Sequence, residues 1–351
     1  MRIVHLYHDF HPRRGGIEDY LAELACDQAR WPDTEPVILT ANVRPRTVIE
    51  DWRGVRVIRA AAAGRYFTPL CPSWGWWLRC LRPDRVHLHL PCPLGEWVLN
   101  LTAPRAPLIV SLHNDYVRPE WAMRWHRPLH LAILRRATAI LVAAPDYAAS
   151  SPALTAVPAK VTIVPYGVDL RRYAPGQSPR RRELLSAGRL CYYKGIEVLL
   201  AAAPAVPAPI TILGDGPWRA RLQGQARSLQ HVTFHGAVSE DDLVRHMQQS
   251  ALFLFPSTER SEAFGLAQLK AMACGTPVIS TDLPGVSWLN QHGRSGLVVP
   301  VRDAHALAEA INSLLEDEPW RAELGRGART RAEEFPVERM LQATARVYAS
   351  G

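Results

Sequence analysis

The sequence predicts an α/β protein with two doubly wound domains, each built on a largely parallel sheet. Short apolar runs alternate with helical patterns along almost the whole chain, which is the order of parallel α/β units. A length of 351 residues accommodates two domains of ordinary size. Prolines and glycines interrupt any regular pattern in residues 164–182, so we expect the linker between the domains there.

The expected strands are short runs rich in β-branched residues. In the first half they are RIVHLY, VILT, VRVIRA, RVHLHLP, PLIVSLHND, ATAILVAAP and VTIVPYGVD. In the second half they are LLSAG, ITILG, VTFHG, ALFLFP, TPVIS and GLVVP. Helical patterns lie between them, and the tail from Pro319 is helical with a break at Pro336.

Residues 257–282 form the most informative stretch, because they place a glycine-started helix between two apolar strands. Gly265 opens this helix, and Gly275 lies just past its end. A strand that leads into such a helix directs free backbone amides and the positive end of the helix dipole toward the carboxyl edge of the sheet. The pattern therefore predicts a phosphate-binding site. Glu262 lies just before the helix, and Lys270 lies inside it.

The segment EAFGLAQLKAMACGTPVIS resembles the donor-site motif of retaining glycosyltransferases of family four, which have the GT-B fold. In that family the motif carries two glutamates separated by seven residues. Glu262 matches the first glutamate, whereas Lys270 stands where relatives have a carboxylate that accepts hydrogen bonds from ribose hydroxyls. A buried amphipathic helix with one stray charge is the alternative interpretation, but other motifs of the family follow in the right order.

The resemblance implies two Rossmann-like domains that face one another across a cleft. It gives an acceptor-binding domain at 1–168, a nucleotide-sugar-binding domain at 169–335 and a final helix, 336–351, that returns to the first domain. The family needs no bound metal or cofactor. His5, His8 and His11 recur at a spacing of three, but this spacing gives no common face on a strand and loop, and we expect no metal there.

Two cations and a glycine pair in the second half belong to the expected donor site. Arg189 ends a strand and Lys194 precedes a helix, so both point toward the strand ends, where they can hold a diphosphate and offset the charge of a departing nucleotide. Gly214, with Gly216, allows close backbone approach. The implied donor-binding residues are Gly16, Arg189, Lys194, Gly214, Phe264, Gly265, Leu266 and Lys270.

Three residues of the first half are assigned roles by the resemblance. Gly16 follows the first strand in a loop that lies beneath the donor diphosphate in the family. His113 lies at the carboxyl end of an apolar strand, and the family places a histidine there close to the transferred sugar. We therefore take His113 and Glu262 as the catalytic candidates. His89 shares a strand face with His87 and either lines the acceptor side or packs in the core.

Residues 52–136 contain 7 of the 11 tryptophans and 13 arginines. Tryptophan beside arginine is typical of a surface that meets anionic lipid, although helices that bury the tryptophans are an equal alternative. The resemblance favours the lipid surface, because many such transferases extend lipid-linked glycans on the inner membrane face. No signal peptide or membrane span is recognisable, so we expect a cytoplasmic protein, peripheral on the plasma membrane.

The resemblance implies a hexosyltransferase that moves a mannose-type sugar from a nucleotide donor, GDP in preference to UDP, to a glycan or lipid-linked glycan during surface polysaccharide assembly. A GT-B sugar-nucleotide epimerase is one alternative. A catalytically weak partner protein, marked by Lys270, is another. The net charge of +8 is diffuse and accompanies no recognised nucleic-acid module, so we expect no nucleic-acid partner.

Overall fold

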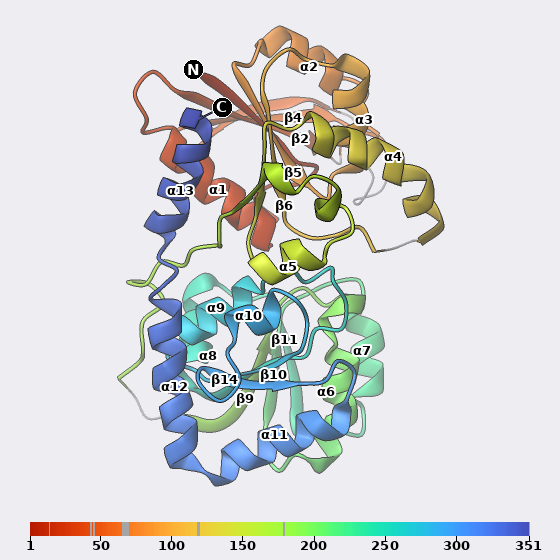
Figure 1. Cartoon of the computed structure of the whole chain (residues 1–351). Coiled ribbons are helices and arrows are strands. Elements are labelled where there is room, and N and C mark those ends of the chain that lie inside the picture. The colour runs from red at the N-terminus through yellow and green to blue at the C-terminus, as the bar shows by residue number, and fades with distance from the viewer. Residues whose placement is uncertain are drawn as a thin grey trace. The chain divides into compact units, whose positions relative to one another are not determined.

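The computed structural model describes residues 1–13, 15–42, 44, 46–64, 70–117, 120–177 and 180–350, and the chain divides into two compact units (Figure 1). The first unit comprises residues 1–164 together with the C-terminal residues from Leu341 onward, and the second comprises Pro165–Met340. Residues 178 and 179 of the expected linker lie outside the described residues. Because helix α13 (Val337–Ser350) crosses the boundary, the first unit is completed by the far end of the chain.

The described strands of the first unit form one sheet in the spatial order β3-β4-β2-β1-β5-β6-β7-β8. They are β1 (Arg2–Leu6), β2 (Glu35–Asn42), β3 (Val48–Trp52), β4 (Val55–Ala61), β5 (Arg85–Leu90), β6 (Leu108–Leu112), β7 (Ala139–Val142) and β8 (Val161–Ile163). Only β3, which the sequence patterns missed, runs antiparallel among these strands, and it pairs with β4 at the edge. The chain leaves β1 and β5 toward opposite edges of the sheet, so their carboxyl ends form the switch point where α/β sheets bind ligands.

Helices cover both faces of this sheet. They are α1 (Gly16–Gln28), α2 (Trp74–Leu81), α3 (Pro93–Thr102), α4 (Glu120–Arg136), α5 (Pro145–Ser150) and α13, with short 3-10 turns η1 (Leu154–Ala156) and η2 (Pro158–Lys160). In Figure 1, α1 and α13 lie side by side, and the ring of Trp31, just beyond α1, contacts the ring of Tyr348 on α13. Helix α3 packs against both α2 and α4.

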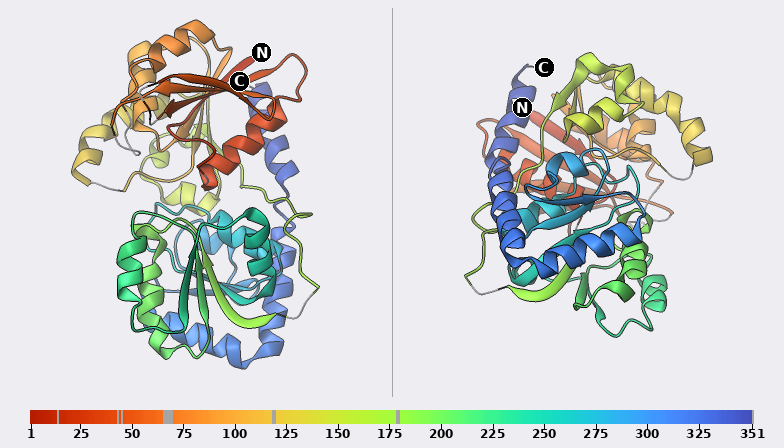
Figure 2. Two further views of the ribbon diagram at one scale, coloured as in Figure 1. Left: turned by 180° about the vertical axis from the view of Figure 1, so that it is seen from behind. Right: turned by 60° about the horizontal axis from the view of Figure 1, so that its bottom comes forward.

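The second unit repeats the architecture with a parallel sheet in the order β11-β10-β9-β12-β13-β14, flanked by helices as Figure 2 shows from behind. Its strands are β9 (Arg181–Ala187), β10 (Ile210–Leu213), β11 (Val232–Gly236), β12 (Ser250–Phe255), β13 (Val278–Thr281) and β14 (Gly296–Val299). Its helices are η3 (Tyr192–Lys194), α6 (Ile196–Ala202), η4 (Ala203–Ala205), α7 (Arg219–Gln225), α8 (Glu240–Gln249), α9 (Leu266–Ala273), α10 (Val286–Leu289), α11 (Ala304–Glu316) and α12 (Glu318–Ala332). The switch point here lies at the carboxyl ends of β9 and β12.

Four tryptophans of the first unit are exposed on α2, α3 and α4. Trp76 is 58% exposed, Trp97 53%, Trp121 71% and Trp125 85%, whereas Trp74 is fully buried. The three helices are neighbours, so we call these four side chains the tryptophan surface. Of the two alternatives for the Trp- and Arg-rich segment, inward packing of the tryptophans holds for Trp74 and fails for these four. No described helix is long and apolar enough to cross a membrane.

Candidate functional site

A lysine and a glutamate meet at the switch point of the second unit. Lys194 follows β9 and Glu262 follows β12, and the Lys194 Nζ donates to Glu262 Oε2 at 2.5 Å. Both side chains are mostly buried, and the Lys194 ammonium also lies 5.0 Å from the ring centroid of Phe255. The strand order therefore brings together two residues that are 68 positions apart.

Gly195 makes the approach of these two loops possible. Its φ of +67° lies in the left-handed region, and a Cβ there would stand 1.7 Å from the carbonyl oxygen of Pro256. Any other residue would push the loop after β9 away from the loop after β12. Backbone geometry thus fixes Lys194 beside Glu262.

Helix α9 presents its amino end just after Glu262. Gly265 is the N-cap residue, with φ of +89°, and it supplies no side-chain cap to the first turn. The first amides of a helix have no intrahelical acceptor, and they carry the positive end of the helix dipole. An anion placed beside Gly265 would be attracted by these amides and by the Lys194 ammonium together.

The remaining predicted donor residues of this unit have distinct environments. The Phe264 side chain is buried against the rings of Tyr166, Trp288 and Phe335, so only its backbone is available to a ligand. Leu266 is partly exposed in the first turn of α9, and Arg189 is exposed two residues beyond the end of β9. Gly214, with φ of +120°, is needed for packing, because a Cβ there would lie 1.9 Å from the oxygen of Gly188.

Lys270 has a carboxylate partner that the sequence patterns did not suggest. Its Nζ donates to Glu240 Oε1 at 2.8 Å, and it lies 5.2 Å from the ring centroid of Tyr173. The Tyr173 hydroxyl donates to the same carboxylate oxygen. Glu240 occupies the first turn of α8, so this position of α9 carries an ion pair to the neighbouring helix. The sequence signal for Glu240 was only an acidic run after the Ser239 cap.

Histidines gather at the switch point of the first unit. His113 follows β6 and its Nε2 lies 3.1 Å from Nδ1 of His89 on β5, whose Nε2 lies 3.0 Å from Nδ1 of His5 on β1. His89 is fully buried, as the core alternative expected, and His113 is 5% exposed. Burial lowers the pKa of His5 to about 4 and that of His113 to about 3. Gly16 is exposed at the start of α1.

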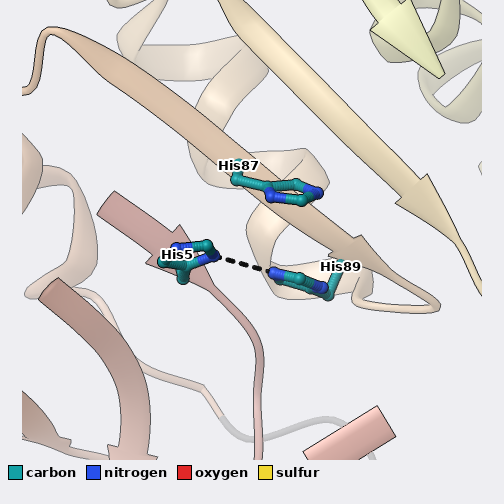
Figure 3. A group of neighbouring side chains, drawn as sticks. All are labelled: His5, His87 and His89. Atoms are coloured by element: carbon teal, nitrogen blue, oxygen red, sulfur yellow. Dashed lines mark hydrogen bonds between the residues drawn. The ribbon is translucent and has the colours of Figure 1, made fainter. Parts of the chain in front are cut away.

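His5, His87 and His89 are the one group of described side chains whose ligand-type atoms lie close enough for a metal, all within 4.8 Å of one another (Figure 3). His5 comes from β1 and the other two come from the neighbouring strand β5, where His87 is the register partner of His5. The alternation of side chains along β5 predicted that His87 and His89 share a face. Only the pairing of β1 with β5 adds His5 to them. His8 and His11 are not part of this group.

A second histidine cluster surrounds a buried carboxylate on α3. Glu96 is fully buried and accepts hydrogen bonds from His126, from His130 Nδ1 at 2.6 Å and from the Tyr116 hydroxyl at 2.8 Å. Burial raises the pKa of Glu96, but the hydrogen bonds and charges of the two histidines outweigh it and leave that pKa below its usual value. The spacing of four between His126 and His130 on α4 is the sequence signal for this cluster, which the motifs above did not include.

Two Rossmann-like units in one chain are the architecture of the GT-B fold. Residues 15–167 match the family model of the glycosyl transferase 4-like domain, and residues 172–331 match that of the glycosyl transferases group 1. The chain is 32% identical over 353 residues to D-rhamnosyltransferase WbpZ of Pseudomonas aeruginosa, covering 94% of this chain and 91% of the relative. The chain belongs to the group 1 glycosyltransferase family.

Other known proteins agree with this assignment. O-antigen chain mannosyltransferase C of Escherichia coli is 31% identical over 374 residues, covering 100% of this chain and 98% of the relative. Among solved structures, sucrose-phosphate synthase from Thermosynechococcus elongatus has a TM-score of 0.86 at 23% identity, covering 99% of this chain and 98% of that one. HepE of Anabaena, solved with UDP-glucose, has a TM-score of 0.82 at 21% identity, covering 100% of both chains. These structures share the GT-B fold.

Proposed function

We propose that this transferase moves a mannose-type hexose from a nucleotide sugar to a hydroxyl of a glycan acceptor in surface polysaccharide assembly, with retention of configuration and without a metal or other cofactor. The observation that carries the proposal is the Lys194–Glu262 pair beside the open amino end of α9. The similarity to a rhamnosyltransferase and to an O-antigen mannosyltransferase supports the choice of sugar and pathway.

Each unit has a proposed share of the chemistry. The second unit holds the donor, whose diphosphate lies at the amides of α9 and at Lys194 and Arg189. Glu262 forms a hydrogen bond with the donor sugar. The acceptor hydroxyl then bonds to the anomeric carbon as the carbon–oxygen bond to the phosphate breaks, and the departing phosphate takes the hydroxyl proton. Fixed positive groups favour this step because negative charge grows on the phosphate oxygen. His113 of the first unit shapes the sugar pocket.

GDP is the proposed nucleotide, since a further relative, a mannosyltransferase of Mycobacterium tuberculosis, is described as GDP-mannose-dependent. Thermal shift with GDP-mannose, GDP, UDP-glucose and UDP tests this choice. A ligand at a hundred times its dissociation constant adds about 2.7 kcal/mol to the free energy of unfolding. We expect GDP-mannose and GDP to raise the melting temperature of the wild-type protein, and we expect no such rise in the Lys194→Ala variant. A shift with UDP-glucose alone would overturn the choice of GDP.

Product analysis separates transfer from the epimerase alternative. GDP-mannose incubated without acceptor should remain mannose-configured, and conversion to another GDP-hexose would identify an epimerase. When a lipid-linked glycan acceptor is added, the anomeric configuration of the new linkage reports retention or inversion. Unchanged activity after treatment with a metal chelator is the result expected for a metal-independent transferase.

The tryptophan surface is the proposed contact with an anionic membrane, which would bring the enzyme to a lipid-linked acceptor. Indole rings favour the headgroup region, and the exposed arginines of α4, Arg124, Arg127 and Arg135, favour anionic lipid. Sedimentation with phosphatidylglycerol vesicles should recover the protein at low salt and lose it at high salt, because the Debye length shrinks. Trp121→Ser with Trp125→Ser should abolish recovery, whereas Ile49→Ser, an exposed apolar residue on β3, should not. Equal recovery with phosphatidylcholine would refute the anionic contact.

A further inference from the structure

Helix α4 has two different faces. Trp121 and Trp125 of the tryptophan surface are exposed, whereas His126 and His130 are buried and pair with Glu96. At about 3.6 residues per turn, the centre of the histidine pair lies about 140° around the helix from the centre of the tryptophan pair. The helix therefore presents its indole rings to solvent, while its histidines hold it to α3, the helix that carries Glu96.

Pro128 interrupts α4 between the two histidines. Proline has no backbone N–H, so the helix lacks one hydrogen bond to the preceding turn at this position. The half after Pro128 has anchors of its own. Ile133 and Leu134 are fully buried, and Arg136 Nη1 donates to a carbonyl oxygen of α3 at 2.7 Å. That half is therefore held to the first unit by more than His130.

The half of α4 before the proline depends on His126. Among the described residues 121–129, His126 is the only one that is buried. Its Nε2 donates to Glu96 Oε2, and the pKa of Glu96 lies below its usual value, so that the acceptor is an ionised carboxylate. A hydrogen bond to a charged group is stronger than one between neutral groups. This bond is therefore the main buried attachment of the half that carries the two exposed tryptophans.

The same carboxylate connects α4 to the loops at the ends of β5 and β6. The Tyr116 hydroxyl donates to Glu96 Oε2 at 2.8 Å and accepts from the Cys92 backbone N–H at 2.7 Å. These directions are fixed, because an amide N–H can only donate and a carboxylate can only accept. Cys92 follows β5, and Tyr116 follows β6 three residues beyond His113. Glu96 thus joins the first half of α4 to the strand ends of the proposed acceptor side.

We propose that His126 is a positioning residue for membrane contact. Through Glu96 it holds the first half of α4, with Trp121 and Trp125, at a fixed place relative to the ends of β5 and β6. Indole rings on a fixed helix lose less conformational entropy on binding than rings on a mobile one, so the anchor raises the affinity for a bilayer. The consequence for membranes rests on the proposed function of the tryptophan surface, whereas the anchoring of the helix does not.

Two substitutions at His126 differ mainly in the hydrogen-bond donor. His126→Gln keeps an N–H donor on a side chain of similar reach, and His126→Met has a similar length and no donor. Hydrogen exchange of the segment 121–127, followed by mass spectrometry, measures the anchoring without any lipid. Exchange there should rise about tenfold in His126→Met, the scale of one hydrogen bond to a charged group, and stay near the wild-type rate in His126→Gln.

Sedimentation with phosphatidylglycerol vesicles measures the consequence for membrane contact. The lipid concentration that recovers half of the protein should rise about tenfold in His126→Met and little in His126→Gln. His130→Met is the matched control, because it removes a donor to the same carboxylate from the half of α4 that has other anchors. It should lower stability in urea to a similar extent but leave the exchange of segment 121–127 and the vesicle recovery near the wild-type values.

Pro128→Ala supplies a rescue that a general loss of stability would not show. It restores the missing N–H, so the first half of α4 is held by the helix itself and should exchange more slowly than in the wild type. His126→Met combined with Pro128→Ala should regain vesicle recovery. If His126→Met alone does not fold, the single variant Pro128→Ala still tests the proposal, because unchanged exchange of segment 121–127 there would overturn it.

The remaining outcomes separate the anchor from the membrane contact. Equal changes in His126→Met and His130→Met would show that Glu96 only stabilises the first unit, and they would overturn the proposal. Unchanged exchange in His126→Met would do the same. Faster exchange with unchanged vesicle recovery would uphold the anchoring by His126 and refute the membrane contact of the tryptophan surface.

Discussion

The two switch points of this molecule use opposite kinds of polar group. In the first unit, His5, His89 and His113 form a chain of neutral imidazoles that is almost completely buried. In the second unit, the Lys194–Glu262 pair is charged and keeps between 11 and 16% of its side-chain surface in contact with solvent. The histidines of the first site are buried without a counter-charge, and this favours their neutral forms. At the second site, Lys194 and Glu262 offset each other's charge and keep some contact with solvent, so both can remain charged.

This difference corresponds to what each site is proposed to contact. A sugar or glycan hydroxyl is uncharged and is suited by uncharged donors and acceptors, such as neutral imidazoles. A diphosphate carries negative charge and needs cations and helix amides, and the second unit offers Lys194 and the amino end of α9. The same fold, repeated in one chain, thus provides a neutral and a charged site through the residues at its strand ends.

Glu96 shows that histidine alone does not make the first site neutral. It lies in the same unit, is equally buried, and has two histidines as partners, yet its pKa is lowered and it stays ionised. A single carboxylate is therefore the difference between the two histidine clusters of the first unit.

Glu96→Gln should destabilise the protein by roughly 3–5 kcal/mol, because removal of one member of a buried charged network leaves its partners uncompensated. Urea denaturation at pH 7 measures the loss. Glu35→Gln provides the control, since Glu35 pairs with Arg2 on the surface, where such pairs contribute about 0–1 kcal/mol. Equal losses in the two variants would show that the Glu96 cluster is not a charged one.

Lys194→Ala and Arg189→Ala should each slow transfer by roughly 2.7–4 kcal/mol of activation free energy, the usual cost of losing one preorganised group opposite a developing charge. Lys194→Ala should also lower stability, because Glu262 is left without its buried partner. Lys194→Arg keeps the charge and should recover part of the rate. Lys160→Ala is the control, since Lys160 donates to carbonyl oxygens in the first unit. Wild-type turnover in both alanine variants would remove these cations from the mechanism.

The neutral histidines should make stability depend on pH between about 6.5 and 4. The pKa of His5 is about 4 in the folded protein, below the value near 6.5 of an unfolded chain. The unfolded chain therefore binds protons first as the pH falls, and stability that is complete above pH 6.5 is lost progressively down to the folded pKa. For His5 this amounts to roughly 3 kcal/mol at pH 4.

His5→Asn should lower the slope of the free energy of unfolding against pH by about 1.4 kcal/mol per pH unit between about pH 6.5 and 4. This change in slope is expected whether or not the variant loses stability at pH 7. The exposed His305, replaced by Gln, should leave the slope unchanged. The lowered pKa of Glu96 acts in a different window, because its contribution is present above about pH 4.5 and is lost only as the pH falls through the folded value. A His5→Asn slope equal to that of the wild type would mean that folding does not change the pKa of His5.

Sequence patterns predicted the architecture well, because alternating apolar runs and helical periods are local. They placed Lys194 and Glu262 at strand ends, and the strand order then brought the two side chains together. They missed β3, since its alternating exposed and half-buried residues lack the apolar run of a central strand.

The contacts that were missed are those between elements far apart in sequence. Nothing local to His5 indicates that β1 pairs with β5, and nothing local to Lys270 indicates that α8 supplies Glu240. The family pattern placed Lys270 in the donor site as a replacement for a carboxylate. The structure adds that a carboxylate lies 2.8 Å away on the next helix.

The Lys270–Glu240 pair permits the last and smallest test. Lys270→Glu alone sets two carboxylates against one another, so a loss of donor binding in that variant would be ambiguous. The double variant Lys270→Glu with Glu240→Lys restores the ion pair in reverse and should restore stability. If Lys270 donates to a ribose hydroxyl or a phosphate oxygen, the double variant should still bind GDP-mannose more weakly by roughly 1.5–3 kcal/mol, the range for a hydrogen bond to a charged group. Calorimetry resolves this difference. Wild-type affinity in the folded double variant would mean that Lys270 does not contact the donor and only joins α9 to α8.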